Sequence, residues 1–228
     1  MQCSLYGKLP SKRDFIALGA PRDFLNAWEP WLQGGVSASR AKLGDNWQAA
    51  FLTAPVWRFW LGADLCGKSV IGAFMPSSDG IGRYFPLTLF ACADDNAAIP
   101  PPEFETQDDW FKSAEDFLIS TLDEGKTFEA VVADLNVLAV PLQDVSAAQE
   151  DMIAEDDGTI VVEAGEQRFA DIFESVRKLD HNKIYASTTY WWTIGGEGFA
   201  PVALCGKRMP DPYLFSAMLT GKFSTERS

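Results

Sequence analysis

The segments VWRFWL (56–61), SVIGAF (69–74) and FPLTLFA (85–91) decide the fold of this chain. Each is rich in the β-branched and aromatic residues that favour strands. The separators between them, 62–68 and 76–84, are short and contain residue types typical of turns, above all Gly, Asp, Ser and Pro. Short connections make consecutive strands antiparallel neighbours more often than parallel strands joined by a crossover helix. The centre of the chain is therefore predicted to be an antiparallel sheet.

Helices are expected before and after these strands. Apolar residues recur along one face of a helix over 21–32, and Pro30 is expected to kink this helix or split it in two. The other expected elements are strands at 3–7, 159–163 and 187–193, helices at 47–51, 106–122, 127–135 and 169–179, and a last helix that begins at Asp211 and Pro212. Because strands and helices alternate in blocks, the predicted fold class is α/β (α+β), with an antiparallel or mixed sheet covered by helices. A chain of 228 residues fits one large domain, and we expect a single domain over 1–228.

The chain is acidic, with 19 Lys and Arg against 32 Asp and Glu and a formal net charge of −13. Because phosphate binding needs clustered Lys and Arg, no nucleic-acid partner is expected, and binding to an anionic membrane surface is disfavoured. No apolar run approaches the ~20 residues that span a bilayer, so no membrane insertion is expected. The oligomeric state is not predicted.

Cysteine usage indicates the compartment. The four cysteines, Cys3, Cys66, Cys92 and Cys205, are scattered and form no CxxC pair. Residues 1–15 contain no apolar segment of the kind found in secretory signals. Scattered cysteines without a signal are typical of reduced thiols, so a cytoplasmic protein is expected.

The stretch GADLCGKS (62–69) matches the phosphate-binding loop pattern GxxxxGK[ST] letter for letter. Such a loop must open into a helix whose N-terminal amides face the phosphates. Here Val70 and Ile71 follow the motif and Pro76 comes soon after, which leaves no room for a useful helix. We therefore interpret the segment as the connection of a β-hairpin, and nucleotide hydrolysis through Lys68 is a remote alternative.

Catalytic, metal and cofactor signatures are missing from the sequence. The only histidine, His181, lies between a helix and a strand and is expected in a surface loop. No GxSxG nucleophile motif is present, and one histidine without paired cysteines does not make a zinc site. The segment 155–158 faintly resembles a calcium loop but lacks ligands at the first and twelfth positions. No catalytic residue, metal or cofactor is predicted.

Two charged turns are the candidate recognition elements. PSSDGIGRYFPL (76–87) places Asp79 and Arg83 around two glycines, where they either hold the turn together or face a partner. GKLPSKRDF (7–15) carries three basic residues in an acidic protein, which favours contact with an acidic surface. The alternative for both turns is a purely structural role.

These turns carry a family resemblance. YGKLPSKRDF (6–15) resembles the GKLPxxGDF signature that opens the type VI secretion-associated TagF (ImpM) family. LGDNWQAAFLTAPVWRFWL (43–61) and GAFMPSSDGIGRYFPLTLFA (72–91) are similar to its W…aPvWrF and PSxDxxGRxFPL patterns. STTYWWT (187–193) and KRMPDPYLFSAML (207–219) match the family more loosely, and Arg13 stands where the family usually has Gly.

The resemblance implies a regulator and not an enzyme. Members of this family repress type VI secretion after translation, some of them through the forkhead-associated scaffold protein Fha, and their fold is a three-layer α/β/α sandwich likened to longin-type and SRX-type domains. The motif positions carried over, our candidate interaction surface, are Lys8, Leu9, Pro10 and Asp14 in the first turn and Pro76, Ser77, Asp79, Gly82 and Arg83 in the second. We expect the two turns to lie near each other. The alternative function is a small-ligand sensor, in which Trp57, Asp79 and Arg83 line a pocket for an acidic metabolite.

Overall fold

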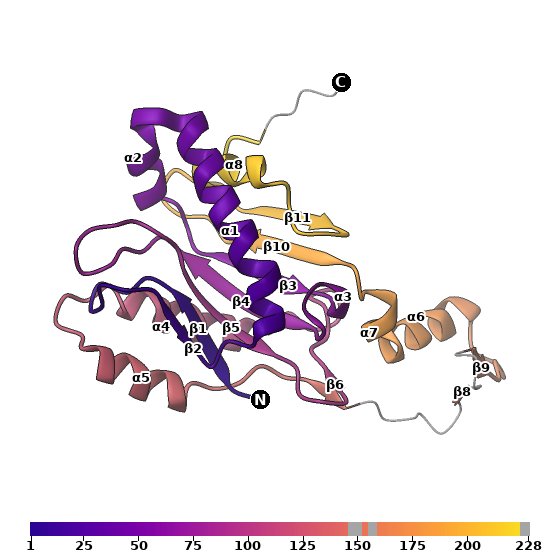
Figure 1. Cartoon of the computed structure of the whole chain (residues 1–228). Helices are drawn as coiled ribbons and strands as arrows, with labels where there is room; N and C mark the ends of the chain where they lie inside the picture. Colours follow the sequence, from indigo (N-terminus) through magenta and orange to yellow (C-terminus); the bar gives the residue numbers. More distant parts are fainter. Residues whose placement is uncertain (146–151, 155–158, 224–228) are drawn as a thin grey trace.

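The computed structural model describes residues 1–145, 152–154 and 159–223, and its centre is a seven-stranded sheet (Figure 1). The strands lie in the order β11-β10-β3-β4-β5-β1-β2, and all neighbouring pairs are antiparallel. Their bounds are β1 Cys3–Gly7, β2 Ile16–Leu18, β3 Trp57–Leu61, β4 Val70–Met75, β5 Leu87–Cys92, β10 Thr189–Thr193 and β11 Val202–Gly206. The predicted antiparallel arrangement of the three central strands is confirmed.

The sheet is buried on both faces. Neighbouring side chains of β3 point to opposite sides, so Phe59 joins one hydrophobic cluster and Trp60 the other, and both are at most 1% exposed. Trp191 and Trp192 of β10 divide in the same way, because Trp191 is buried in the first cluster and Trp192 packs against the second. Antiparallel sheets often leave one face to solvent, and this one does not.

Helices supply the cover. One face packs against α1 (Arg22–Leu43), α2 (Trp47–Leu52) and α8 (Phe215–Thr220), and the other against α4 (Asp108–Ser120) and α5 (Phe128–Val137). The predicted α+β class and the three-layer arrangement are therefore confirmed (Figure 1). A split of the first helix at Pro30 was wrong, because α1 is one continuous helix of 22 residues. The Pro30 ring is exposed, while Trp28 and Trp31 on either side of it are buried against the sheet.

The remaining elements lie outside the main layers. They are α3 (Ala63–Cys66), β6 (Ala97–Ala98), β7 (Asp144–Val145), β8 (Met152–Ala154), β9 (Ile160–Val162), α6 (Phe169–Leu179), α7 (His181–Ile184) and the 3₁₀ turns Gly44–Asn46 and Pro212–Leu214. In Figure 1, α7 lies next to α3 and α6 extends away from the sheet. Among the described residues, no helix has both the length and the apolar character that a membrane span requires.

Candidate functional site

The structure brings the two charged turns together. The ammonium group of Lys8, just after β1, lies 2.7 Å from Asp79 Oδ2 in the turn after β4. Ser77 Oγ donates a hydrogen bond to the Lys8 carbonyl (2.8 Å), and the Gly80 amide donates to the Lys12 carbonyl (2.7 Å). A Cβ atom at position 80 would lie 2.9 Å from the Pro10 carbonyl oxygen, so this close approach of two backbones favours glycine.

Asp79 is the centre of this junction. Its Oδ2 accepts hydrogen bonds from Lys8 Nζ and Arg83 Nε, and its Oδ1 accepts from the backbone amides of Ile81 and Arg83. Burial by itself raises the pKa of the Asp79 carboxyl, but the hydrogen bonds from Lys8, Arg83 and Ile81 outweigh burial and hold this pKa well below its usual range. With four donors on its two oxygens, the carboxylate has no capacity left for a ligand.

Burial separates the predicted residues into supporting and exposed ones. Lys8, Leu9, Ser77 and Asp79 are buried, Pro10 and Pro76 are half-buried, and Asp14, Gly82 and Arg83 are exposed. The exposed part of the junction also contains residues that the motif comparison missed. We define the turn surface as Arg13, Asp14, Phe15, Ile81, Gly82 and Arg83.

Two apolar side chains stand out on the turn surface. Phe15 is 51% and Ile81 57% exposed. The Phe15 ring is held edge-on against buried Phe85 at a centroid distance of 4.8 Å, and Lys8 Nζ lies 5.0 Å from its centroid. Arg83 Nη2 donates a hydrogen bond to the Arg13 carbonyl (2.6 Å), which ties the edges of the two turns together. A signal for these residues was present in the sequence as apolar side chains inside charged turns.

The pocket expected from Trp57, Asp79 and Arg83 is not formed. Trp57 is 1% exposed and its indole Nε1 donates a hydrogen bond to the Met218 carbonyl at 2.9 Å. The Asp79 carboxylate is saturated by its own turn and by Lys8. A sensor built on these three residues is therefore ruled out by the packing.

The segment 62–69 connects β3 to β4, as interpreted from the sequence. The four-residue helix α3 lies inside the motif, and β4 begins directly after Ser69, so no helix starts where a phosphate would bind. Lys68 forms an ion pair with Asp95 (2.6 Å), and Ser69 Oγ accepts a hydrogen bond from the Ile99 amide (2.8 Å). A Cβ atom at Gly62 would lie 2.1 Å from the Tyr185 carbonyl oxygen, which gives this glycine a packing role.

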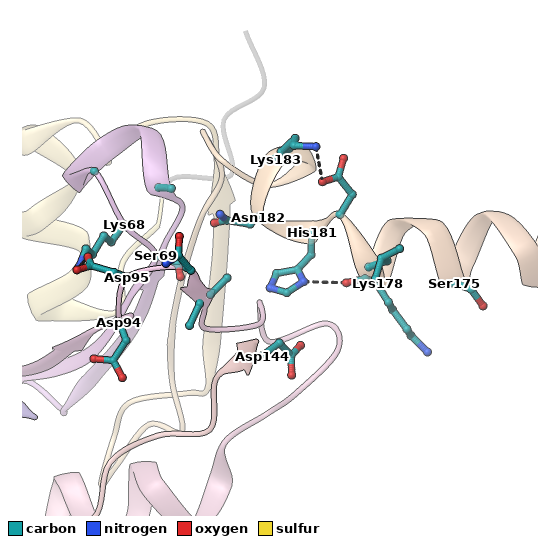
Figure 2. Close-up of a pocket in the computed structure, with 17 residues that line it drawn as sticks. Lys68, Ser69, Asp94, Asp95, Asp144, Ser175, Lys178, His181, Asn182 and Lys183 are labelled. Atoms are coloured by element: carbon teal, nitrogen blue, oxygen red, sulfur yellow. Dashed lines mark hydrogen bonds and ion pairs between the residues drawn. The ribbon is translucent and has the colours of Figure 1, made fainter. Parts of the chain in front are cut away.

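An open cavity of about 1000 Å³ lies beside this connection (Figure 2). Its walls come from 67–69, from 94–98 with Asp144, and from the end of α6 together with α7. The charged residues that line it are Lys68, Lys178, Lys183, Asp94, Asp95, Asp144 and Asp180.

His181 forms part of the cavity wall, and the prediction of a surface histidine was wrong. The residue is only 4% exposed, because the junction between α6 and α7 turns its ring inward, at right angles to Phe104. Nδ1 lies 2.8 Å from the Lys178 carbonyl oxygen. Since a carbonyl can only accept, Nδ1 carries the proton and Nε2 presents a lone pair. Nε2 is buried and has no hydrogen-bond partner in the described part of the chain.

Metal and redox sites receive no support from the described residues. No group of three His, Cys, Asp or Glu among them is placed to hold a metal ion. The four cysteines are free thiols. The weak calcium-loop match at 155–158 lies outside the described residues.

Comparison with known proteins gives a family and a structural relative. The model of the TagF N-terminal domain, described as type VI secretion system-associated, matches residues 4–138. The solved structure of PA0076 from Pseudomonas aeruginosa PAO1 superposes with a TM-score of 0.80 and is 29% identical, and the match covers 99% of this chain and 97% of that one. A search of the curated proteins found no match. The family match includes both charged turns and the 62–69 connection, whereas α6, α7 and His181 follow it in the chain.

Proposed function

Because this chain belongs to the type VI secretion-associated TagF N-terminal domain family, we propose that it represses type VI secretion after translation, in the cytoplasm, by binding a component of the secretion machinery. The partner proposed is the forkhead-associated scaffold protein Fha. The family is one of secretion-associated accessory domains and not a known enzyme family, which supports a role through protein–protein contact.

The observation that supports this proposal is the turn surface and the way it is held. Two segments about 70 residues apart in the chain are locked together beneath the surface by the buried Lys8–Asp79 pair, whose side chains are 7% and 0% exposed. A surface fixed in this way loses little conformational entropy when a partner binds, which favours affinity. The buried pair thus prepares a contact in which it does not itself take part.

The chemistry of the turn surface favours an acidic partner with an apolar anchor point. Phe15 and Ile81 provide exposed apolar area, and interface energy usually concentrates at such a centre. Arg13 and Arg83 lie beside them in a protein of net charge −13, so a complementary acidic patch on the partner would be guided to this face.

Calorimetric titration with the purified Fha scaffold tests the proposal. We expect Ile81→Asp to weaken binding at least about 10-fold, because it places an unpaired carboxylate at the apolar centre of the contact. Ile194→Asp is the matched control, since Ile194 is similarly exposed (62%) but lies in the turn after β10. Equal affinity of wild type and Ile81→Asp would place the contact elsewhere, and no binding by wild type would reject Fha as the direct partner.

Arg83→Ala tests the support of the surface. Its guanidinium bonds Asp79 through Nε (2.6 Å) and the Arg13 carbonyl through Nη2 (2.6 Å), so its removal is expected to lower the melting temperature, the repression of secretion, or both. Unchanged melting together with unchanged repression would remove Arg83 from the proposal.

A further inference from the structure

The cavity beside α7 contains an acceptor without a donor. His181 Nε2 is buried and unpartnered among the described residues, while Nδ1 is fixed by the Lys178 carbonyl. In Figure 2 the ring edge opposite Nδ1 faces the wall that carries Ser69. An unsatisfied buried acceptor costs on the order of 1–3 kcal/mol, and native structures rarely keep one unless a water, an ion or a ligand satisfies it.

The lysines that line the cavity already have carboxylate partners. Lys68 pairs with Asp95 (2.6 Å), Lys183 with Asp180 (3.1 Å) and Lys178 with Glu174 (2.8 Å). An anionic ligand would have to break one of these pairs before it gained a counter-charge. The positive charges at the cavity are therefore already neutralised.

The carboxylates are not all used. Asp94 is paired with the chain's N-terminal amine (2.6 Å), but Asp144 has no ion pair or side-chain hydrogen bond within the described residues. Asp144 is exposed and lies across the cavity from α6, and Figure 2 shows it and His181 on adjoining walls. The cavity is left with a lone pair and a negative charge, both of which require donors.

From these contacts we propose that the cavity binds a small organic cation whose N–H groups donate to His181 Nε2 and whose charge is balanced by Asp144. The chemical class is a primary ammonium or guanidinium compound. A cavity of about 1000 Å³ is large enough for such a molecule. The site shares no residue with the turn surface, so this inference goes beyond the proposed repressor function and does not depend on it.

The single histidine makes the test specific. In protein labelled with ¹⁵N-histidine, only His181 contributes imidazole signals, so no assignment is needed. Before any addition, Nε2 is expected to resonate as an unprotonated nitrogen and Nδ1 as a protonated one. Titration with agmatine, which carries both an ammonium and a guanidinium group, is expected to shift the Nε2 signal saturably at constant pH.

Two variants and two other additives sharpen the result. Asp144→Asn is expected to weaken the agmatine response at least about 10-fold, whereas Asp45→Asn, the same change at an exposed position in the turn after α1, is expected to leave it unchanged. Malonate and glycerol are expected to give no saturable shift. The proposal is overturned if malonate or glycerol acts like agmatine, if Asp144→Asn responds like wild type, or if agmatine, putrescine and arginine all fail, since a bound water then satisfies Nε2.

Discussion

At the scale of single residues, the Lys8–Asp79 pair shows why a motif position can matter without touching a partner. Both side chains are buried, and the pair joins a turn after β1 to a turn after β4. Removing one member of a buried pair leaves the other charge unpaired in a poorly solvated place, which is strongly destabilising.

Asp79→Asn is therefore expected to lower the free energy of unfolding by about 3 kcal/mol, because it leaves the Lys8 ammonium without a counter-charge. Urea unfolding followed by circular dichroism measures the change. Asp14→Asn, at an exposed position of the same junction, should shift the free energy by less than about 0.5 kcal/mol. Similar stabilities of Asp79→Asn and wild type would mean that the pair contributes little to holding the two turns.

The contribution of Asp79 is also expected to depend on pH. Because its folded-state pKa lies below the unfolded value of about 4, the unfolded chain takes up the additional proton as the pH falls. The stabilisation is fully present above about pH 5 and is lost progressively below about pH 4. The difference in unfolding free energy between wild type and Asp79→Asn should shrink over this acidic range. A difference that stayed constant down to about pH 3 would contradict a lowered pKa.

Thiol reactivity should single out one cysteine. Burial raises the pKa of Cys3 to about 11, of Cys66 to about 12 and of Cys92 to about 11, whereas Cys205 is exposed on the edge strand β11. Only the thiolate reacts with a disulfide reagent. At pH 8 the native protein is expected to release one equivalent of thionitrobenzoate rapidly from Ellman's reagent, and Cys205→Ser should abolish this phase. Rapid release of two or more equivalents would indicate that a buried thiol is accessible.

At the scale of elements, the sequence was most informative where the pattern is long and local. The three central strands and the helices at 127–135 and 169–179 follow from residue type and periodicity, and Thr127 caps α5 by accepting a hydrogen bond from the Ala130 amide. The start of α4 is different. Thr106 looked like its cap, but the helix begins at Asp108 after Gln107, whose φ is 55°. The Gln107 side chain bonds the backbone of Leu142, a long-range contact that no local pattern reveals.

Pro30 is where a strong local rule was outweighed by packing. Its ring removes one backbone hydrogen bond from α1, yet the apolar face of this helix lies on the sheet both before and after it. Pro30→Ala is expected to raise the free energy of unfolding by about 1 kcal/mol or more, because it restores that hydrogen bond. Urea unfolding measures it. Pro21→Ala is the control, since Pro21 is the N-cap residue and interrupts no helical bond. A destabilised Pro30→Ala would show that α1 needs the local geometry that proline imposes.

At the scale of the whole molecule, the sites differ in how far the sequence could reveal them. The two charged turns were found through their motifs, although which of their residues are exposed depends on the packing beneath Phe15 and Asp79. The cavity was missed. Its walls come from segments that are far apart in the chain, and His181 is flanked by polar residues that suggest a solvated loop.

The arrangement of the sheet also bears on what can fold alone. The family match ends at residue 138, but β10 pairs with β3 and packs Trp191 against Trp28, Trp31 and Phe59 at centroid distances of 5.7, 4.7 and 5.5 Å. The last helix, α8, places Phe215 against the same aromatic group. A chain that ended at residue 138 would leave one edge of β3 unpaired and this aromatic group open to water.

We therefore expect the full chain to unfold as a single domain, with far-ultraviolet circular dichroism and tryptophan fluorescence giving one coincident transition in urea. The fragment 1–138 is expected to show no cooperative transition and to bind the dye ANS, because its exposed aromatic face is loosely packed. Adding the fragment 139–228 should reduce dye binding if the missing strands and helix dock on that face. A fragment 1–138 that unfolds cooperatively by itself would mean instead that the family-matched region is an independent domain and that β10, β11 and α8 are additions to it.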